Sequence, residues 1–190
     1  MSKTSKDEIL NAARLSAQAH GYTGLNIRSL ANEVGIKAAS IYHHFPSKAD
    51  LGAAVAQRYW QDTEAALKAL RETERDALSS LRRYPHIFRR SLESQNRICM
   101  ASFMSAEYDD LPAPVKKEVQ KFADVNIAWL NSQLQEAGIA GSENGEKRAR
   151  AIFSAVAGAQ LMARSRNDID LFDDIIEGYS QAGLMPAVQK

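Results

Sequence analysis

The side chains with the clearest chemistry lie close together between residues 37 and 48. Their ammonium, hydroxyl and imidazole groups belong to Lys37, Ser40, Tyr42, His43, His44 and Lys48. Cations and hydroxyl groups bind phosphate oxygens, and Lys and Ser side chains also bond to base edges in the major groove of DNA. These residue types therefore favour contact with a nucleic acid.

The sequence lacks the patterns that are typical of enzymes. It contains no Gly-rich phosphate loop, no His-Glu-x-x-His and no Gly-x-Ser-x-Gly. His43 and His44 are adjacent, so they point to different sides of a helix and cannot form the i, i+4 pair of a zinc site. We expect no catalytic residues, no metal and no other cofactor.

The elements that position this segment are predicted to be helices. Apolar residues recur at helical spacing almost everywhere, and no sustained apolar and polar alternation marks a strand. The fold class is therefore all-α. The predicted helices cover residues 7–20, 27–34, 38–45, a long segment from 47 to about 67, 78–93 with a kink or break at Pro85, 98–107, 115–136, 146–166 and 168–182.

Local signals divide the first sixty residues into short helices. Asn26 is a good N-cap and Gly35 ends the helix that follows it. Pro46 ends the third helix, and Ser47 with Asp50 forms a capping-box pattern that begins a long fourth helix. The spacing predicts a helix, a glycine turn and a second helix, with apolar residues forming a small core. Phe45 is expected in that core, whereas Tyr42 fits either the core or the outer surface.

This pattern resembles the DNA-binding signature of TetR family regulators. The matching residues are Leu30, Ala31, Gly35, Ile36, residues 41–45, Ser47, Lys48 and Leu51, and upstream residues 9–13, Gly21 and Tyr22. The resemblance implies a three-helix, helix-turn-helix DNA-binding domain over residues 1–50. It also implies a larger helical domain for effector binding and dimerisation over residues 51–190, joined to the first by the long helix.

The resemblance also implies which residues contact double-stranded DNA. They are Asn26, Arg28, Lys37, Ala38, Ala39, Ser40, Tyr42, His43, His44 and Lys48. Tyr42, His44 and Lys48 match phosphate-holding positions, although Lys48 is also compatible with a solvated lysine. Around the third helix two residues depart from the family pattern: Lys37 replaces a capping Ser or Thr, and Ala39 replaces a frequent glycine. The start of the third helix is therefore expected to differ.

Charge is distributed unevenly along the chain. The formal net charge is only +1, but residues 1–60 carry seven Lys and Arg against four Asp and Glu, whereas residues 61–190 carry seventeen against nineteen. The N-terminal part is thus the more positive, as contact with phosphates requires. The asymmetry is mild, and a solvated surface explains it equally well.

The larger domain has fewer local signals. The resemblance implies an effector pocket, for which we name Cys99, Phe103, Tyr108 and Trp129, with an unidentified small molecule as effector. The segment around Cys99 is similar to a branch of the family with a cysteine here, some members of which respond to electrophiles. A small, inert core residue is the alternative interpretation of Cys99.

The last two predicted helices are rich in small and apolar residues. The resemblance assigns them to a four-helix interface of a homodimer, for which we name Ala155, Ala159, Met162, Phe172 and Ile176. Symmetric dimers dominate soluble oligomers. An intramolecular helix pair is the alternative.

Together these inferences predict a transcriptional repressor that binds a pseudo-palindromic operator as a dimer and releases it when an effector binds. Activation remains open, and a helical binding or adaptor protein that no longer contacts DNA is the alternative function. No apolar run approaches the roughly 18 residues that span a bilayer, and no apolar stretch follows the first six residues. With a single cysteine and no intramolecular disulfide, we expect a cytoplasmic protein without membrane contact.

Overall fold

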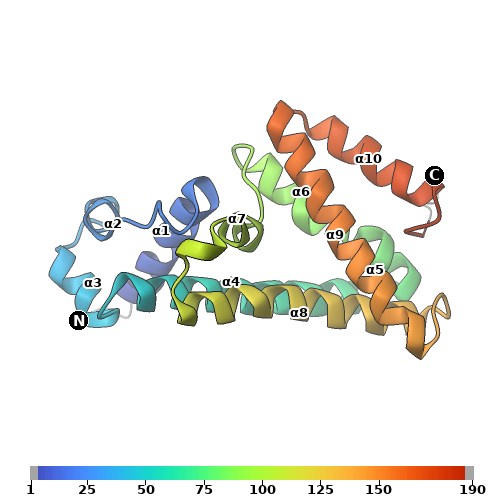
Figure 1. The fold of residues 1–190 in the computed structure, drawn as a ribbon, viewed down its shortest axis with the longest axis horizontal. Helices are drawn as coiled ribbons and strands as arrows, with labels where there is room; N and C mark the ends of the chain where they lie inside the picture. The colour runs from blue at the N-terminus through green and yellow to red at the C-terminus, as the bar shows by residue number, and fades with distance from the viewer. Residues whose placement is uncertain (1–3, 187–190) are drawn as a thin grey trace. The chain divides into compact units, whose positions relative to one another are not determined.

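The computed structural model describes the backbone of residues 4–186 and the side chains of residues 6–141 and 144–186. Within these residues the chain is helical and contains no strand, which confirms the all-α class (Figure 1). The helices are α1 (Thr4–His20), α2 (Ile27–Val34), α3 (Ala38–His44), α4 (Lys48–Thr73), α5 (Ala77–Arg83), α6 (Pro85–Glu93), α7 (Met100–Ala106), the 3-10 helix η1 (Tyr108–Asp110), α8 (Ala113–Glu136), α9 (Ser142–Arg166) and α10 (Ile169–Gln181).

The described residues form two compact units. The first unit contains the chain up to Asp62 together with Met100–Phe122, and the second contains Thr63–Cys99 together with the chain from Ala123 onward. The divisions fall inside α4 and α8, so each of these helices contributes residues to both units. The functional division that the sequence predicts at residue 50 stays a prediction.

The predicted helix boundaries of the first unit are present. The Oδ1 atom of Asn26 accepts a hydrogen bond from the N–H of Ser29 at 3.0 Å, which satisfies one of the free N–H groups at the start of α2. Gly35 ends α2 with φ at 76°, a left-handed conformation that glycine adopts without a steric penalty. The N–H of Ile36 then bonds back to the carbonyl of Ala31 at 2.9 Å, which closes a Schellman motif.

The beginning of α4 is fixed by Ser47 and Asp50. The Ser47 hydroxyl oxygen accepts from the Asp50 N–H at 3.1 Å, and the same hydroxyl donates to Asp50 Oδ2 at 2.7 Å. The first bond is the predicted cap. The carboxylate, however, reaches the Ser47 hydroxyl rather than its backbone N–H, so the pattern is half of a capping box.

A single apolar core holds α1, α2 and α3 together. Ile9, Ala13, Leu30, Ile41 and Phe45 are all at most 3% exposed and belong to one buried cluster. The prediction that Phe45 is a core residue is confirmed. Because α3 contributes only Ile41 to the buried positions within its own span, most of its surface is left outside this core.

The second unit shows that Pro85 divides the predicted helix 78–93 in two. Pro85 is the first residue of α6, where its missing N–H removes no helical hydrogen bond. Asp76 caps α5 through a 2.7 Å bond from the N–H of Ser79, and this hydrogen bonding lowers the pKa of Asp76 from 3.8 to about 2. Tyr84 between the helices is fully buried and its hydroxyl donates to Asn126 Oδ1 at 2.9 Å.

Helices α6, α9 and α10 pack against one another in the second unit, where a buried glutamine joins two segments (Figure 1). Gln160 on α9 is 1% exposed. Its Oε1 accepts from the N–H of Cys99 at 2.9 Å, and its Nε2 donates to the carbonyl of Phe88 at 2.6 Å. None of the helices in the described part of the chain is long and apolar enough to cross a membrane.

We expect Gln160→Met to lower the free energy of unfolding by about 1–3 kcal/mol, because the buried N–H of Cys99 then loses its acceptor. Urea denaturation followed by circular dichroism measures the change. Gln120→Met, at an exposed glutamine on α8, is the control and should change stability by less than about 0.5 kcal/mol. Equal stability of the two variants would contradict a structural role for Gln160.

Candidate nucleic-acid interface

The outer surface of α3 gathers most of the predicted DNA-contacting side chains. Those that are exposed are Lys37, Ala39, Ser40, Tyr42 and His43, while Ala38 and His44 are half-buried. Tyr42 is 51% exposed, so the structure places it outside the core. The helix therefore presents a cation, hydroxyl groups and imidazole together on a surface that its own chain does not cover.

The residues at the start of α2 and α3 differ in whether their side chains form capping hydrogen bonds. Asn26 and Arg28 are exposed at the first turn of α2, but the Asn26 side chain already caps that helix. Lys37 occupies the N-cap position of α3 and forms no side-chain capping bond. This agrees with the departure from the family pattern, because a lysine side chain has no acceptor for an N–H group.

Lys48 lies at the first residue of α4 and contacts the turn that follows α1 (residues 21–23). Its Nζ donates to the carbonyl of Thr23 at 3.3 Å and lies 4.6 Å from the centre of the Tyr22 ring. An ammonium group over an aromatic face is a stabilising contact. Lys48 is thus held in place by two groups of one turn and is not a freely moving surface lysine.

The same turn is held by Glu107, which sequence reasoning missed. Its carboxylate accepts from the N–H of Tyr22 at 2.5 Å, and from the N–H and the hydroxyl of Thr23 at 3.2 and 2.5 Å. Glu107 follows α7 and is separated from these partners by more than eighty residues of sequence. No local pattern indicates such a contact, and the residue type alone suggests only a solvated acidic side chain.

Two glycines make the close packing around this turn possible. At Gly21, where φ is 69°, an added Cβ atom would overlap Glu107 Oε2. At Gly52 on α4, a Cβ atom would lie 2.7 Å from Cε2 of Tyr22. The Tyr22 ring consequently packs directly on the α4 backbone, and its burial raises the pKa of Tyr22.

The four residues proposed for effector binding are not gathered at one place in either unit. Phe103 and Tyr108 belong to the first unit, and Cys99 and Trp129 belong to the second. Tyr108 is 50% exposed with Lys116 Nζ 4.2 Å from its ring centre, whereas Trp129 stacks on Tyr84. Their role in effector binding stays a prediction.

Cys99 is 2% exposed and lies immediately before α7. The sequence predicts a helix start at residue 98, whereas α7 begins at Met100. The thiol of Cys99 therefore does not lie in the first turn of the helix, as the prediction had it. Reactive thiols occupy electropositive and partly exposed sites. The burial of Cys99 favours the inert core interpretation, and a sensor role stays a prediction.

The residues proposed for a dimer interface separate into two groups. Ala159 and Phe172 are at most 1% exposed and Ile176 is 8% exposed, so their own chain covers them. Met162 is 46% exposed and Ala155 is half-buried. The buried residues can contribute to an interface only by positioning their helices. Met162 and Ala155 can contact another molecule directly.

An all-helical chain with a helix-turn-helix whose second helix is exposed is typical of transcriptional regulators. A family model described as bacterial regulatory proteins of the tetR family matches residues 9–55. The HTH-type transcriptional repressor AcnR of Corynebacterium diphtheriae is 40% identical over 52 residues, which are 27% of this chain and 27% of that protein. The matched segment thus spans about a quarter of that relative's length.

Solved structures extend the similarity to almost the whole chain. A TetR transcriptional regulator from Legionella pneumophila has a TM-score of 0.88 and 28% identity, covering 96% of this chain and 98% of that one. A TetR family regulator from Agrobacterium tumefaciens has a TM-score of 0.84 and 29% identity, covering 93% and 95%. The chain is therefore similar to TetR family regulators, through the family model over residues 9–55 and through the fold that it shares with these solved structures.

We expect Glu107→Gln to loosen the turn at residues 21–23, because a neutral amide accepts weaker hydrogen bonds than a carboxylate and its NH₂ group cannot accept at all. The N–H groups of Tyr22 and Thr23 should exchange with solvent at least about tenfold faster. Hydrogen exchange measured by NMR provides this readout. Asp109→Asn, an exposed neighbour on η1, is the matched control. Unchanged exchange at both amides in Glu107→Gln would show that the carboxylate does not hold the turn.

Proposed function

We propose that this chain is a repressor that binds a pseudo-palindromic operator as a homodimer and releases it when a small molecule binds to the larger helical part. One observation carries the DNA-binding half of this proposal. The side of α3 that its own chain leaves uncovered holds Lys37, Ser40, Tyr42 and His43, the residue types that contact phosphates and base edges. A helical adaptor protein that does not bind DNA would not require these side chains on the exposed side of α3.

The proposed contacts divide into two kinds. Tyr42 and Lys48 contact phosphates and set the position of α3 on the duplex, so they add affinity without selecting a sequence. Lys37, Ser40 and His43 reach base edges or the adjoining backbone, and the short side chains of Ala38 and Ala39 allow α3 to approach the groove closely. Asn26, whose side chain caps α2, and the exposed Arg28 lie at the start of that helix, where free N–H groups favour phosphate.

The surfaces of α9 and α10 support the proposed homodimer. At helical spacing α9 carries Ala151, Ala155, Gly158 and Met162, and α10 carries Leu171, Ile175 and Gly178. A Cβ atom added at Gly158 or Gly178 would meet nothing within 4 Å. Each helix thus has an open, flat stripe of small and apolar side chains, which permits close approach of another helix. Leu161, 58% exposed, adds apolar area beside the stripe of α9.

A dimer places two α3 helices in successive major grooves, about 34–36 Å apart. An effector can shift this arrangement only by as much as its affinity differs between the bound and released states. We assign the coupling to α4, since its 26 residues run without interruption from the first unit into the second.

We expect Lys48→Met to weaken binding to the operator and to unrelated DNA by similar factors, because a phosphate contact is independent of sequence. The slope of log K against log salt should fall by about 0.9 for each phosphate that the protein no longer neutralises, which is nearly 2 for the dimer. Fluorescence anisotropy with an operator obtained by selection from random DNA measures both quantities.

The control for this experiment is Lys68→Met, which removes one positive charge from an exposed position of α4 outside the proposed interface. Its salt slope should remain that of the unchanged protein. If Lys48→Met and Lys68→Met behave alike, Lys48 holds no phosphate. If selection returns no DNA at all, the repressor proposal fails and the adaptor alternative takes its place.

We expect Leu161→Lys combined with Met162→Lys to convert the dimer into a monomer, because like charges would then face each other across a two-fold interface. Sedimentation velocity measures the mass, and operator affinity should fall with it. Ser132→Lys, at an exposed position on α8, introduces the same kind of charge outside the stripes and should leave the dimer intact. A double variant that keeps the dimer mass would place the interface elsewhere.

A further inference from the structure

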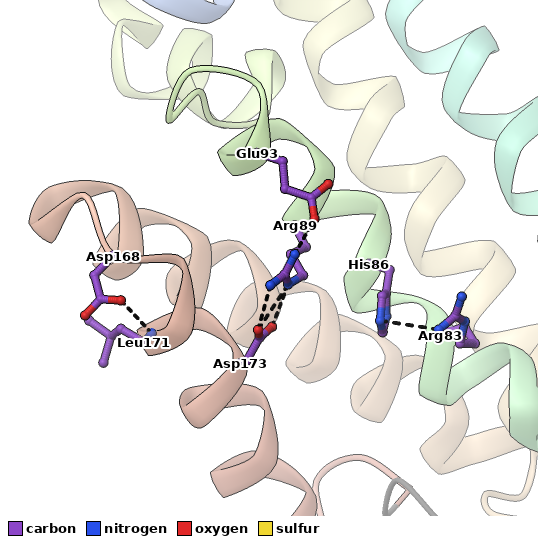
Figure 2. Close-up of polar contacts among 7 residues, drawn as sticks. All are labelled: Arg83, His86, Arg89, Glu93, Asp168, Leu171 and Asp173. Atoms are coloured by element: carbon purple, nitrogen blue, oxygen red, sulfur yellow. Dashed lines mark hydrogen bonds and ion pairs between the residues drawn. The ribbon is translucent and has the colours of Figure 1, made fainter.

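The second unit contains a groove that the sequence does not indicate. It lies between the α5–α6 segment and α10 and has a volume of about 530 Å³, a size typical of small-molecule sites. Pro85, Phe172 and Ile176 give it an apolar floor. Several charged and polar side chains line the rest, part of which Figure 2 shows as sticks.

Most of the charge that lines this groove is already paired. Arg89 on α6 donates from Nε to Asp173 Oδ1 at 2.8 Å and from Nη2 to Asp173 Oδ2 at 2.9 Å, and it also pairs with Glu93 (Figure 2). This pairing raises the pKa of Arg89. Burial, and secondarily the charge of Arg83, lowers the pKa of His86 from its ordinary value. Glu177 remains as an exposed carboxylate.

Arg82 is different from the other cations of the groove. Its Nε atom is buried and has no hydrogen-bond acceptor among the residues that the structure describes. An N–H group buried without an acceptor costs free energy, and more so when it belongs to a charged side chain. A guanidinium group matches the two oxygens of a carboxylate, to which it donates two parallel hydrogen bonds.

We propose that the groove binds a small organic carboxylate whose apolar body lies on Pro85, Phe172 and Ile176 and whose carboxylate pairs with Arg82. In the proposed repressor function this carboxylate is the effector, so its effector role rests on that proposed function. The apolar floor supplies affinity through burial, and the positive charge of Arg82, whose Nε has no acceptor among the described residues, supplies the preference for an anion over a neutral molecule of the same shape.

The groove and the proposed dimer surface use different sides of α10. Asp173, Ile176 and Ser180 line the groove, whereas Leu171, Ile175 and Gly178 form the stripe. Residues two apart on a helix point about 200° away from each other, as Asp173 does from Ile175 and Ile176 from Gly178. A ligand and a second copy of the chain can therefore contact α10 at the same time, and occupancy of the groove can bias how the dimer is arranged.

Two pairs of probes test the preference for a carboxylate. They are 2-naphthoate with 2-naphthamide and decanoate with decanamide, each measured by calorimetric titration of the intact protein without DNA. We expect at least one carboxylate to bind at least about tenfold more tightly than its amide. Arg82→Met should remove this difference, Arg82→Lys should retain part of it, and Ser180→Phe should abolish binding of both by filling the groove. Arg90→Met, an exposed arginine of α6, is the control and should bind like the unchanged protein.

The site is disproved if neither carboxylate binds, if Arg82→Met keeps the preference for the anion while its melting curve stays normal, or if Ser180→Phe binds as before. The effector role is tested separately, by adding the bound carboxylate to a preformed complex with the selected operator. Binding through Arg82 without release of DNA would overturn the effector role but leave the site. A protein that binds the carboxylate but no DNA would instead overturn the proposed function.

Discussion

The packing of α3 is the constraint on which the rest of this structure depends. A helix of seven residues is not stable in water by itself, because too few hydrogen bonds offset the cost of the first turn. Ile41 and the adjoining Phe45 fix it against α1 and α2. The side of α3 that carries Tyr42 and His43 is then the side that remains free. The position of two apolar side chains thus decides which polar ones face a partner.

Much of this arrangement follows from local signals in the sequence. Asn26, Gly35 and Pro46 each act on the backbone within a few residues, so their effect on helix boundaries can be predicted without knowledge of the fold. Lys37 is an instructive case, because the absence of a capping side chain was evident from the residue type alone and the structure contains no such bond. Pro85 likewise allowed a kink or a break, and its place at the first turn of α6 resolved the choice.

What could not be predicted depends on partners far away in the sequence. Helical spacing identified Ala159, Phe172 and Ile176 as apolar positions, but it could not tell whether their own chain or a second one covers them. Glu107 and Arg82 carried no signal at all. A carboxylate or a guanidinium is ordinary on a helix surface. Only the fold shows that the carboxylate bonds to the turn after α1 and that Nε of the guanidinium has no acceptor among the described residues.

The contacts of the turn at residues 21–23 also bear on the proposed phosphate contact of Lys48. An ammonium group has three N–H donors, and Lys48 uses one of them for the carbonyl of Thr23. A lysine held in this way has already given up much of its rotamer freedom, so pairing with a phosphate costs less entropy than for a mobile side chain. Thr23 is itself held by Glu107, at the end of the segment that begins beside Cys99. Any displacement of Glu107 would therefore release the turn that orients Lys48, and would weaken a phosphate contact without touching α3.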